Sequence, residues 1–330
     1  MPKLHQSLAD RSHAKLTSRT RSRFTGPLLV TGSSRSGTSY LRRAANYFDE
    51  VHLEYELDIL RDALEAWRQI DVPSSKAAHD AFLDRVLKIK SSNSAEMIGK
   101  QTPEFYDRLY ERCLEHGSFG KWIEDLYRGE NTNQIWGDKC ELAQVRYFLS
   151  VYPDCQAIFI IRDPRAVASS FYEHSGVNCV TTSLAWVAAA RLAQDLAAEH
   201  GSDRIMLVRY EDLLSDLPRT MQLISRFIGQ PVPDRLDEFE LPNQESLHKW
   251  RDRLSDSKIR RIEEICFDEM QAQNYRPGIA TEKRNINRFQ YGLMLVQHSW
   301  ALLKHRRLRL SDFARKIPRL VRYFRFYRTW

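Results

Sequence analysis

The chain of 330 residues is 42% hydrophobic, 11% aromatic and 28% charged, which excludes a fully disordered or fibrous protein and indicates one large or two small globular domains. Its formal net charge of +7 combines +5 from residues 1–23 and +12 from residues 283–330 with −10 from residues 24–282. Nucleic-acid-binding proteins more often spread basic residues over the folded core, so no nucleic-acid partner is expected for this acidic body with basic ends.

Neither an export signal nor a membrane span is expected. Residues 1–23 are basic and lack the apolar core of a signal peptide. The longest apolar stretches, at residues 184–198 and 291–303, are interrupted by polar side chains and fall short of the roughly 20 apolar residues that a span needs. The five cysteines are an odd number, lie far apart and form no CxxC pair, which favours a reducing compartment. We therefore expect a cytoplasmic protein.

Predicted strands and helices alternate along the chain. Short apolar runs predict strands at residues 27–31, 51–53, 134–137, 157–161 and 204–208. Apolar residues at helical spacing predict helices at residues 38–48, 56–70, 76–90, 104–128, 183–200 and 213–227, and a further helix begins at Pro164. This alternation predicts an α/β fold, in which a parallel central sheet is flanked by helices. Three tryptophans at helical spacing are predicted to be core residues: Trp67, Trp122 and Trp186.

A glycine-containing loop follows the first predicted strand and reads Gly32-Ser33-Ser34-Arg35-Ser36-Gly37-Thr38-Ser39. Its glycine spacing is that of a phosphate-binding P-loop, in which backbone N–H groups and a helix N-terminus surround an anion. Thr38 occupies the position of the lysine that an NTPase needs, and Arg35 supplies a cation inside the loop. The loop therefore fits a smaller anionic group bound without a metal. The alternative is an ordinary Ser/Gly turn.

A second candidate anion site follows the strand at residues 157–161. Arg162 comes directly after this strand, and Ser170 lies eight residues later, about two helical turns on. A guanidinium group and a hydroxyl group at this spacing can meet one phosphate from two directions. Ser169 is the competing hydroxyl. The alternative is a plain Arg–Asp turn with a helix cap, which is common in α/β proteins.

Together these two segments resemble the sulfotransferases that use 3′-phosphoadenylyl sulfate (PAPS). The loop is similar to their 5′-phosphosulfate-binding sequence P-[RK]-S-G-T-[ST], with Ser34 where proline is usual. Residues 162–170 are similar to their 3′-phosphate signature R-[DN]-P-x-x-x-x-x-S, whose spacing favours Ser170 over Ser169. The resemblance covers roughly residues 27–277. It implies a P-loop-like sulfotransferase fold, PAPS as co-substrate, adenosine 3′,5′-bisphosphate (PAP) as product, and no metal.

Three further segments resemble sulfotransferase segments, most closely those of the tyrosylprotein and carbohydrate branch. Trp136-Gly137-Asp138-Lys139 resembles the lysine segment at a strand end, and Tyr210-Glu211-Asp212-Leu213 resembles the Y-E-D-L segment. Ser246-Leu247-His248-Lys249-Trp250 resembles the late loop that covers the nucleotide, with His248 inserted before the lysine. The nucleotide-binding residues that the resemblance implies are Ser33, Ser34, Arg35, Ser36, Gly37, Thr38, Ser39, Arg162, Ser170, Tyr210, Lys249 and Trp250.

Sulfuryl transfer depends on positioning and on cations placed where negative charge develops. Arg35 and Lys139 are the candidates for this role, with a surface salt bridge as the alternative for Lys139. The acceptor must lose a proton, so a general base is also expected. Glu56 is the first choice, because tyrosylprotein sulfotransferases place their catalytic glutamate at this distance, 21 residues after Arg35. The alternatives are Glu54, His52, and a helix-stabilising role for Glu56 in a first turn.

Three segments of the chain are distinguished: a basic N-terminal arm (residues 1–25), a sulfotransferase domain (residues 26–282) and a basic, largely helical tail (residues 283–330). The tail interleaves arginines with apolar side chains as a cationic amphipathic helix does. Such a helix fits an anionic membrane surface or an acidic partner, or it packs on the acidic body. A protein at a membrane surface is therefore the localisation to consider beside the cytoplasmic one.

The predicted function is the transfer of a sulfuryl group from PAPS to a hydroxyl of an unidentified acceptor, which can be a carbohydrate, phenol, lipid or peptide. Residues 71–133 are expected to form much of the acceptor wall. The alternative enzyme is a P-loop kinase of a nucleotide or small molecule, against which the missing lysine argues. A non-catalytic membrane-surface or nucleic-acid-binding protein is the third class. Its basic residues would then lie outside the folded body.

Overall fold

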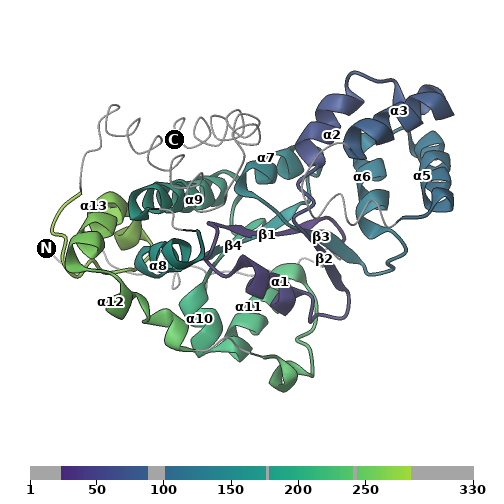
Figure 1. Cartoon of the computed structure of the whole chain (residues 1–330). Helices are drawn as coiled ribbons and strands as arrows, with labels where there is room; N and C mark the ends of the chain where they lie inside the picture. The colour runs from purple at the N-terminus through teal and green to yellow at the C-terminus, as the bar shows by residue number, and fades with distance from the viewer. Residues whose placement is uncertain (1–23, 88–100, 176–177, 241–243, 284–330) are drawn as a thin grey trace, which may run out of the picture.

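The computed structural model describes residues 24–87, 101–175, 178–240 and 244–283. At its centre lies a five-stranded sheet of order β2-β3-β1-β4-β5, in which all neighbouring strands are parallel (Figure 1). Each strand lies at a predicted position, so the α/β class with a parallel central sheet is confirmed. The strands are β1 (Leu28–Gly32), β2 (Val51–Tyr55), β3 (Ile135–Lys139), β4 (Gln156–Ile161) and β5 (Ile205–Arg209).

Helices make up most of the connections between the strands. Short 3₁₀ helices add single turns: η2 (Val72–Ser74), η3 (Leu236–Glu238) and η4 (Gln244–Leu247). The α-helices are α1 (Thr38–Ala45), α2 (Leu60–Trp67), α3 (Lys76–Leu87), α5 (Pro103–His116), α6 (Phe119–Arg128), α7 (Leu142–Val151), α8 (Pro164–Ser175), α9 (Cys179–His200), α10 (Tyr210–Ser215), α11 (Leu217–Ile228), α12 (Trp250–Arg253) and α13 (Asp256–Ala272).

Several helix boundaries differ from the prediction. The helix expected over residues 56–70 begins only at Leu60, because Glu56 and Asp58 have φ angles of 54° and 49°, which a helix does not accommodate. The helix expected over residues 104–128 divides at Gly117, whose φ of 57° ends α5. The helix expected over residues 213–227 divides at Asp216, whose side chain caps α11. The sequence pattern predicts no element where α7 lies.

Both faces of the sheet are buried, because successive side chains of a strand point to opposite sides. On β1, Leu28 and Val30 join a cluster that α1, α10 and α11 cover, whereas Leu29 joins the cluster under α7 and α9. Figure 1 shows these two helical layers on either side of the sheet. Every residue of β4 is buried, which explains its continuous apolar sequence.

Two groups of helices extend the body at opposite ends of the sheet (Figure 1). Helices α2, α3, α5 and α6 form a lobe at the end where β2 and β3 lie, and α8, α12 and α13 pack with α9 at the other end. Trp122 in the lobe and Trp186 in α9 are each 1% exposed, and Trp67 packs against the Trp122 cluster. The predicted core roles of Trp122 and Trp186 are confirmed, whereas Trp67 is only partly buried.

The two basic ends of the chain lie almost wholly outside the described residues, and the amphipathic helix predicted for the tail lies outside them too. All five cysteines fall within the described ranges, and none forms a disulfide. In the part of the chain that the structure describes, no helix is both long enough and apolar enough to cross a membrane.

Candidate active site

The carboxyl ends of the parallel strands bring the predicted site residues to one edge of the sheet. β1 leads into the Gly32–Ser39 loop, β4 leads to Arg162, and β5 leads to Tyr210, while β2 and β3 end at Tyr55 and Lys139. β1 lies between β3 and β4, so the strand order changes direction beside it. Ligands of open α/β sheets bind at such a switch point, outside the carboxyl ends of the strands.

The loop after β1 is shaped by its own backbone and by Tyr210. The N–H of Ser36 donates to the carbonyl of Ser33 at 3.1 Å, and the Ser36 hydroxyl donates to the same oxygen. Gly37 has a φ of 101° at the start of α1, and a Cβ there would lie 2.4 Å from the Tyr210 ring. Both the backbone angle and the packing therefore require glycine. The first N–H groups of α1 point along the helix axis toward an incoming anion.

Exposure separates the loop side chains that can meet a ligand from those that cannot. Ser34, Arg35 and Ser39 are exposed, whereas Ser33 and Ser36 are buried. The N–H and the hydroxyl of the buried Ser36 are both engaged with the Ser33 carbonyl. Arg35 has a φ of 69°, and its side chain turns away from the loop toward α8.

The two predicted anion sites touch each other. Nε of Arg35 donates to Oγ of Ser170 at 3.1 Å. One terminal nitrogen of Arg162 donates to the carbonyl of Arg35 at 3.3 Å. Ser169, the competing hydroxyl, is 4% exposed. Of the two neighbouring serines, Ser170 is therefore the one whose hydroxyl faces the loop.

Arg162 is 8% exposed, and one of its three side-chain nitrogens has no hydrogen-bond partner among the described residues. Its other terminal nitrogen donates to the carbonyl of Ser246 at 2.5 Å, and its guanidinium carbon lies 4.3 Å from the centroid of the Tyr210 ring. Nε of Arg162 is buried and has no hydrogen-bond partner among the described residues. Buried hydrogen-bond donors in proteins are rarely left without a partner. The guanidinium group is therefore held in place while still able to receive an acceptor.

Ser246 is a site residue that the sequence analysis missed. Its carbonyl accepts from Arg162, and its Oγ lies 3.3 Å from the Tyr210 hydroxyl. The late-loop motif at residues 246–250 contains it, although only Lys249 and Trp250 were predicted from that motif. A sequence motif that selects long side chains cannot reveal a contact made by a backbone carbonyl.

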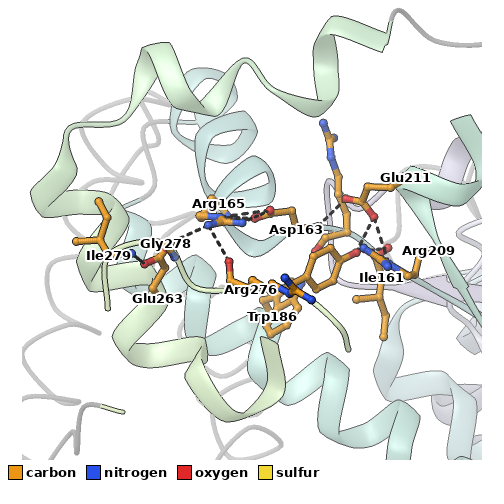
Figure 2. Close-up of polar contacts among 12 residues, drawn as sticks. Ile161, Asp163, Arg165, Trp186, Arg209, Glu211, Glu263, Arg276, Gly278 and Ile279 are labelled. Carbon is orange, nitrogen blue, oxygen red and sulfur yellow. Dashed lines mark hydrogen bonds and ion pairs between the residues drawn. The ribbon is translucent and has the colours of Figure 1, made fainter. Parts of the chain in front are cut away.

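Lys249 and Trp250 take no part in the contacts that join Arg35, Ser170 and Arg162. Lys249 pairs with Glu245 at 3.4 Å on the surface. Trp250 is 8% exposed, and the guanidinium carbon of Arg165 lies 4.3 Å from its ring centroid. Figure 2 shows that Arg165 is itself hydrogen-bonded to Asp163, to Glu263 and to the carbonyl of Arg276. Trp250 thus packs on an arginine that the protein has paired.

A second group of site residues lies where β2 and β3 end side by side. The Lys139 side chain is 7% exposed, and its ammonium group forms an ion pair with Glu56, whose side chain is 38% exposed. The N–H of Glu56 donates to the carbonyl of Lys139 at 3.0 Å. Lys139 thus forms a salt bridge, as the alternative interpretation expects, but this lysine is buried and not at the surface. Glu56 does not begin a helix either, because α2 starts at Leu60.

The two alternative bases are engaged with each other. Nε2 of His52 lies 2.9 Å from Oε1 of Glu54, on the same face of β2. Both residues stand on the edge strand, before the turn that carries Glu56. Over the described ranges, no three His, Cys, Asp or Glu side chains are grouped as metal ligands.

A half-buried carboxyl group, that of Asp58, and a fully buried one, that of Asp138, lie close in sequence to the Glu56–Lys139 pair. The Tyr127 hydroxyl donates to Asp138 Oδ2 at 3.2 Å, and the N–H of Glu141 donates to Asp58 Oδ1 at 2.9 Å. Burial, and then the neighbouring Asp138 carboxylate, raise the pKa of Asp58. Burial also raises the pKa of Asp138. The pair therefore retains protons at pH values where exposed carboxyl groups have lost them.

Comparisons with known proteins agree on one family. The profile of the sulfotransferase family matches residues 27–234. No curated protein matches the chain in sequence. The sulfotransferase domain from the curacin biosynthetic pathway superposes with a TM-score of 0.52 at 13% identity, over 78% of this chain and 100% of that one. At this identity the similarity shows the fold alone.

Two other solved structures superpose less closely. The sulfotransferase domain from the Synechococcus PCC 7002 olefin synthase has a TM-score of 0.46 at 20% identity, over 76% of this chain and 98% of that one. A retinol dehydratase in complex with retinol and PAP has a TM-score of 0.42 at 14% identity, over 77% of this chain and 83% of that one.

The Asp58 and Asp138 carboxyl groups predict a pH-dependent stability. Because the raised pKa values let the folded chain bind more protons than the unfolded chain above about pH 4, the free energy of unfolding should fall as the pH rises. Asp58→Asn keeps an oxygen for the Glu141 N–H but cannot ionise. We expect urea unfolding of this variant to lose less stability between pH 5 and pH 8 than wild type, by about 1 kcal/mol or more.

The matched control is Asp80→Asn. Asp80 is exposed, and its hydrogen bond with Lys76 lowers its pKa, so it is ionised throughout this pH range in both the folded and unfolded chains. The control should keep the wild-type pH dependence. An unchanged pH dependence in Asp58→Asn would show that Asp58 is not protonated in the folded protein over this pH range.

Proposed function

Because the chain belongs to the sulfotransferase family, we propose that it transfers a sulfuryl group from PAPS to a hydroxyl group of an acceptor molecule. The observation that carries this proposal is the contact between the two anion-binding segments, in which Arg35 bridges to Ser170. PAPS carries a phosphosulfate at its 5′ position and a phosphate at its 3′ position. A nucleotide of this kind requires two adjacent anion sites, each with its own cation.

A P-loop kinase is not favoured. Thr38 occupies the position at which a P-loop lysine would contact the β- and γ-phosphates of ATP. The nearest loop cation, Arg35, instead reaches Ser170, on the far side of the loop from Lys139 in the sheet order. The match to the sulfotransferase family also argues against a kinase.

The donor nucleotide would be held at both phosphate positions. The backbone N–H groups at the start of α1 receive the 5′-phosphosulfate, and Ser34 and Ser39 are exposed to supply hydroxyl groups. Arg162 and Ser170 receive the 3′-phosphate. The unpaired Nε of Arg162 supports this role, since a phosphate oxygen would satisfy it. Arg35, exposed and bound to Ser170 in the free enzyme, can turn from that hydroxyl to either phosphate.

Transfer then needs one bond to form and one to break. The acceptor oxygen attacks the sulfur atom, the bond from sulfur to the 5′-phosphate oxygen breaks, and PAP leaves. The acceptor's proton goes to the carboxylate of Glu56. Lys139, and Arg35 after it leaves Ser170, stabilise the negative charge that develops on the departing phosphate oxygen. The acceptor is a hydroxyl-bearing molecule, and the partly exposed carboxylate of Glu56 gives it access.

The backbone at Glu56 supports its assignment as the base. Its left-handed φ is uncommon for a residue other than glycine and costs free energy that the surrounding structure must offset. Glu56 directly follows β2, and its N–H donates to the carbonyl of Lys139. The left-handed conformation then brings the side chains of Glu56 and Lys139 together. Such outliers concentrate where function requires a defined geometry.

Calorimetry with PAP and with ATP–Mg²⁺ tests the choice of donor. We expect PAP to bind with the same affinity with and without EDTA, because the proposed site uses backbone N–H groups, arginines and hydroxyls. ATP–Mg²⁺ should bind weakly. Tight ATP–Mg²⁺ binding without PAP binding would instead support the kinase. Transfer of labelled sulfate from PAPS to a simple phenol then tests the reaction itself.

Arg162→Ala should weaken PAP binding by about one to two orders of magnitude, because a charge-assisted hydrogen bond is worth about 1.5–3 kcal/mol. Adenosine 5′-phosphate, which lacks the 3′-phosphate, should bind the variant almost as well as it binds wild type. Calorimetry with both ligands makes the comparison. Equal losses for the two would show that Arg162 does not read the 3′-phosphate.

Glu56→Gln should lower turnover by about 10²- to 10⁴-fold, because it keeps the shape of the side chain but removes the base. PAP affinity should stay near wild type. A phenol with electron-withdrawing groups needs less help in losing its proton, so it should partly rescue Glu56→Gln but not Lys139→Ala. Steady-state kinetics on phenols of graded acidity provide the measurement.

Glu54→Gln is the matched control for this prediction, since Glu54 is a carboxylate two residues before Glu56, on β2, that pairs with His52 instead of Lys139. It should keep most of the wild-type turnover. If Glu56→Gln retains turnover on a weakly acidic alcohol while Glu54→Gln or a His52 variant loses it, the base is the residue on the strand.

A further inference from the structure

Tyr55 is a half-exposed aromatic residue at the site that the sequence analysis did not select. It is the last residue of β2, and the strand register places it directly opposite Lys139. Its relative exposure of 37% makes it one of the few large apolar side chains that the described surface leaves open to solvent. An exposed ring beside a buried lysine calls for a physical reason.

Three contacts define the position of the Tyr55 ring. The Lys139 ammonium nitrogen lies 4.3 Å from the ring centroid, and the guanidinium carbon of Arg42 lies 5.2 Å from it. The Tyr55 hydroxyl lies 3.3 Å from Oγ of Ser39 in the first turn of α1. The ring therefore connects the lysine at the end of β3 to the loop that receives the donor.

The Tyr55 ring gives the Lys139 ammonium group a second partner besides Glu56. A nearly buried ammonium group needs partners, because desolvating an unpaired charge is costly. Glu56 is one partner. When Glu56 takes the proton of the acceptor, however, its carboxylate becomes neutral and no longer holds the ammonium group by charge. At that moment the charge of Lys139 is needed on the departing phosphate oxygen.

An aromatic ring face attracts a cation without neutralising it. The ring keeps its attraction before and after the proton moves, because Tyr55 does not change charge in the reaction. The attraction is stronger for a desolvated cation, and the Lys139 side chain is only 7% exposed. The hydroxyl contact with Ser39 fixes the ring relative to the donor loop, so the lysine is fixed relative to it as well.

We propose that Tyr55 is a positioning residue for sulfuryl transfer, whose ring holds the Lys139 ammonium group at the departing phosphate oxygen while Glu56 carries the acceptor's proton. This inference rests on the proposed function. Tyr55 itself exchanges no proton and forms no bond in the reaction. Its contribution is the orientation of the cation.

The first test compares Tyr55→Leu, which removes the ring, with Tyr55→Phe, which removes only the hydroxyl. With PAPS and a phenol acceptor, Tyr55→Leu should lower kcat by about two- to thirty-fold, the range expected from the loss of one cation–π contact. Tyr55→Phe should recover most of this loss. KM for PAPS and the affinity for PAP should change little in either variant.

Tyr172→Leu is the matched control. Tyr172 is also a half-exposed tyrosine, with a lysine ammonium, that of Lys258, 4.4 Å from its ring centroid. It stands on α8, and its ring belongs to none of the contacts described for the site. This variant should keep the wild-type kcat. The pair of variants thus separates the loss of a cation–π contact in general from the loss of the one at Lys139.

A double-mutant cycle with Lys139 decides whether Tyr55 acts through this lysine. In the Lys139→Ala background, Tyr55→Leu should cause no further loss of kcat, because the cation that the ring holds is already absent. Residual turnover is measured with an acidic phenol. Equal losses by Tyr55→Leu in both backgrounds would overturn the proposal, and so would a raised acceptor KM with an unchanged kcat, which would make the ring a stacking surface for the acceptor.

The activity of wild type distinguishes failure of the proposed function from failure of the positioning role of Tyr55. If wild type transfers no sulfuryl group from PAPS to any phenol, the proposed function fails, whatever the Tyr55 variants do. If wild type is active and Tyr55→Leu equals it in kcat, the proposed function stands and the positioning role of Tyr55 is overturned.

Discussion

The parallel pairing of β1 with β3 on one side and with β4 on the other is the constraint on which the rest of the structure depends. In this register Val30 lies opposite Lys139 and Gly32 lies opposite Ile160. The loop after β1 therefore starts beside the ends of both neighbours, and the groups that follow each strand meet at one edge. Parallel strands need long crossover connections. In this protein the connections are mostly helices, and they bury both faces of the sheet. The same pairing thus produces the core and the site.

Aromatic rings hold the buried cations of this protein in two different ways. Arg162 lies 4.3 Å from the ring of Tyr210, and Lys139 lies 4.3 Å from that of Tyr55. Among the described residues Arg162 hydrogen-bonds to two carbonyl oxygens, whereas Lys139 also forms an ion pair with Glu56. Arg165 lies equally close to a tryptophan ring but is also paired with two carboxylates. Two carboxylates thus compensate the charge of Arg165 and one compensates that of Lys139, whereas the described contacts of Arg162 are with two carbonyls and a ring.

The network in Figure 2 explains why the Y-E-D-L segment follows β5. Because Ile161 pairs with Arg209, the residues just after these two strands face each other. Tyr210 supports Arg162 through its ring, and Glu211 accepts from the N–H of Asp163 at 3.0 Å and from Tyr275 at 2.6 Å. Glu263 accepts from three successive N–H groups after α13 and from Arg165. These bonds fix the chain on both sides of Arg162, so its guanidinium group needs little reordering when a ligand binds.

The sequence by itself determined the class of the fold, the positions of the strands and the two segments proposed to bind anions, because each of these follows from local apolar runs, glycine spacing and short motifs. Only the tertiary structure decided which residues meet. It joined Arg35 to Ser170 across 135 residues of chain and Lys139 to Glu56 across 83, and it showed that Trp250 packs on Arg165. Ser246 acts through a carbonyl and Tyr55 through a ring face. The late-loop motif contains Ser246 but does not show a carbonyl contact, and Tyr55 lies in no motif, because strand register, and not local sequence, sets which residue faces Lys139.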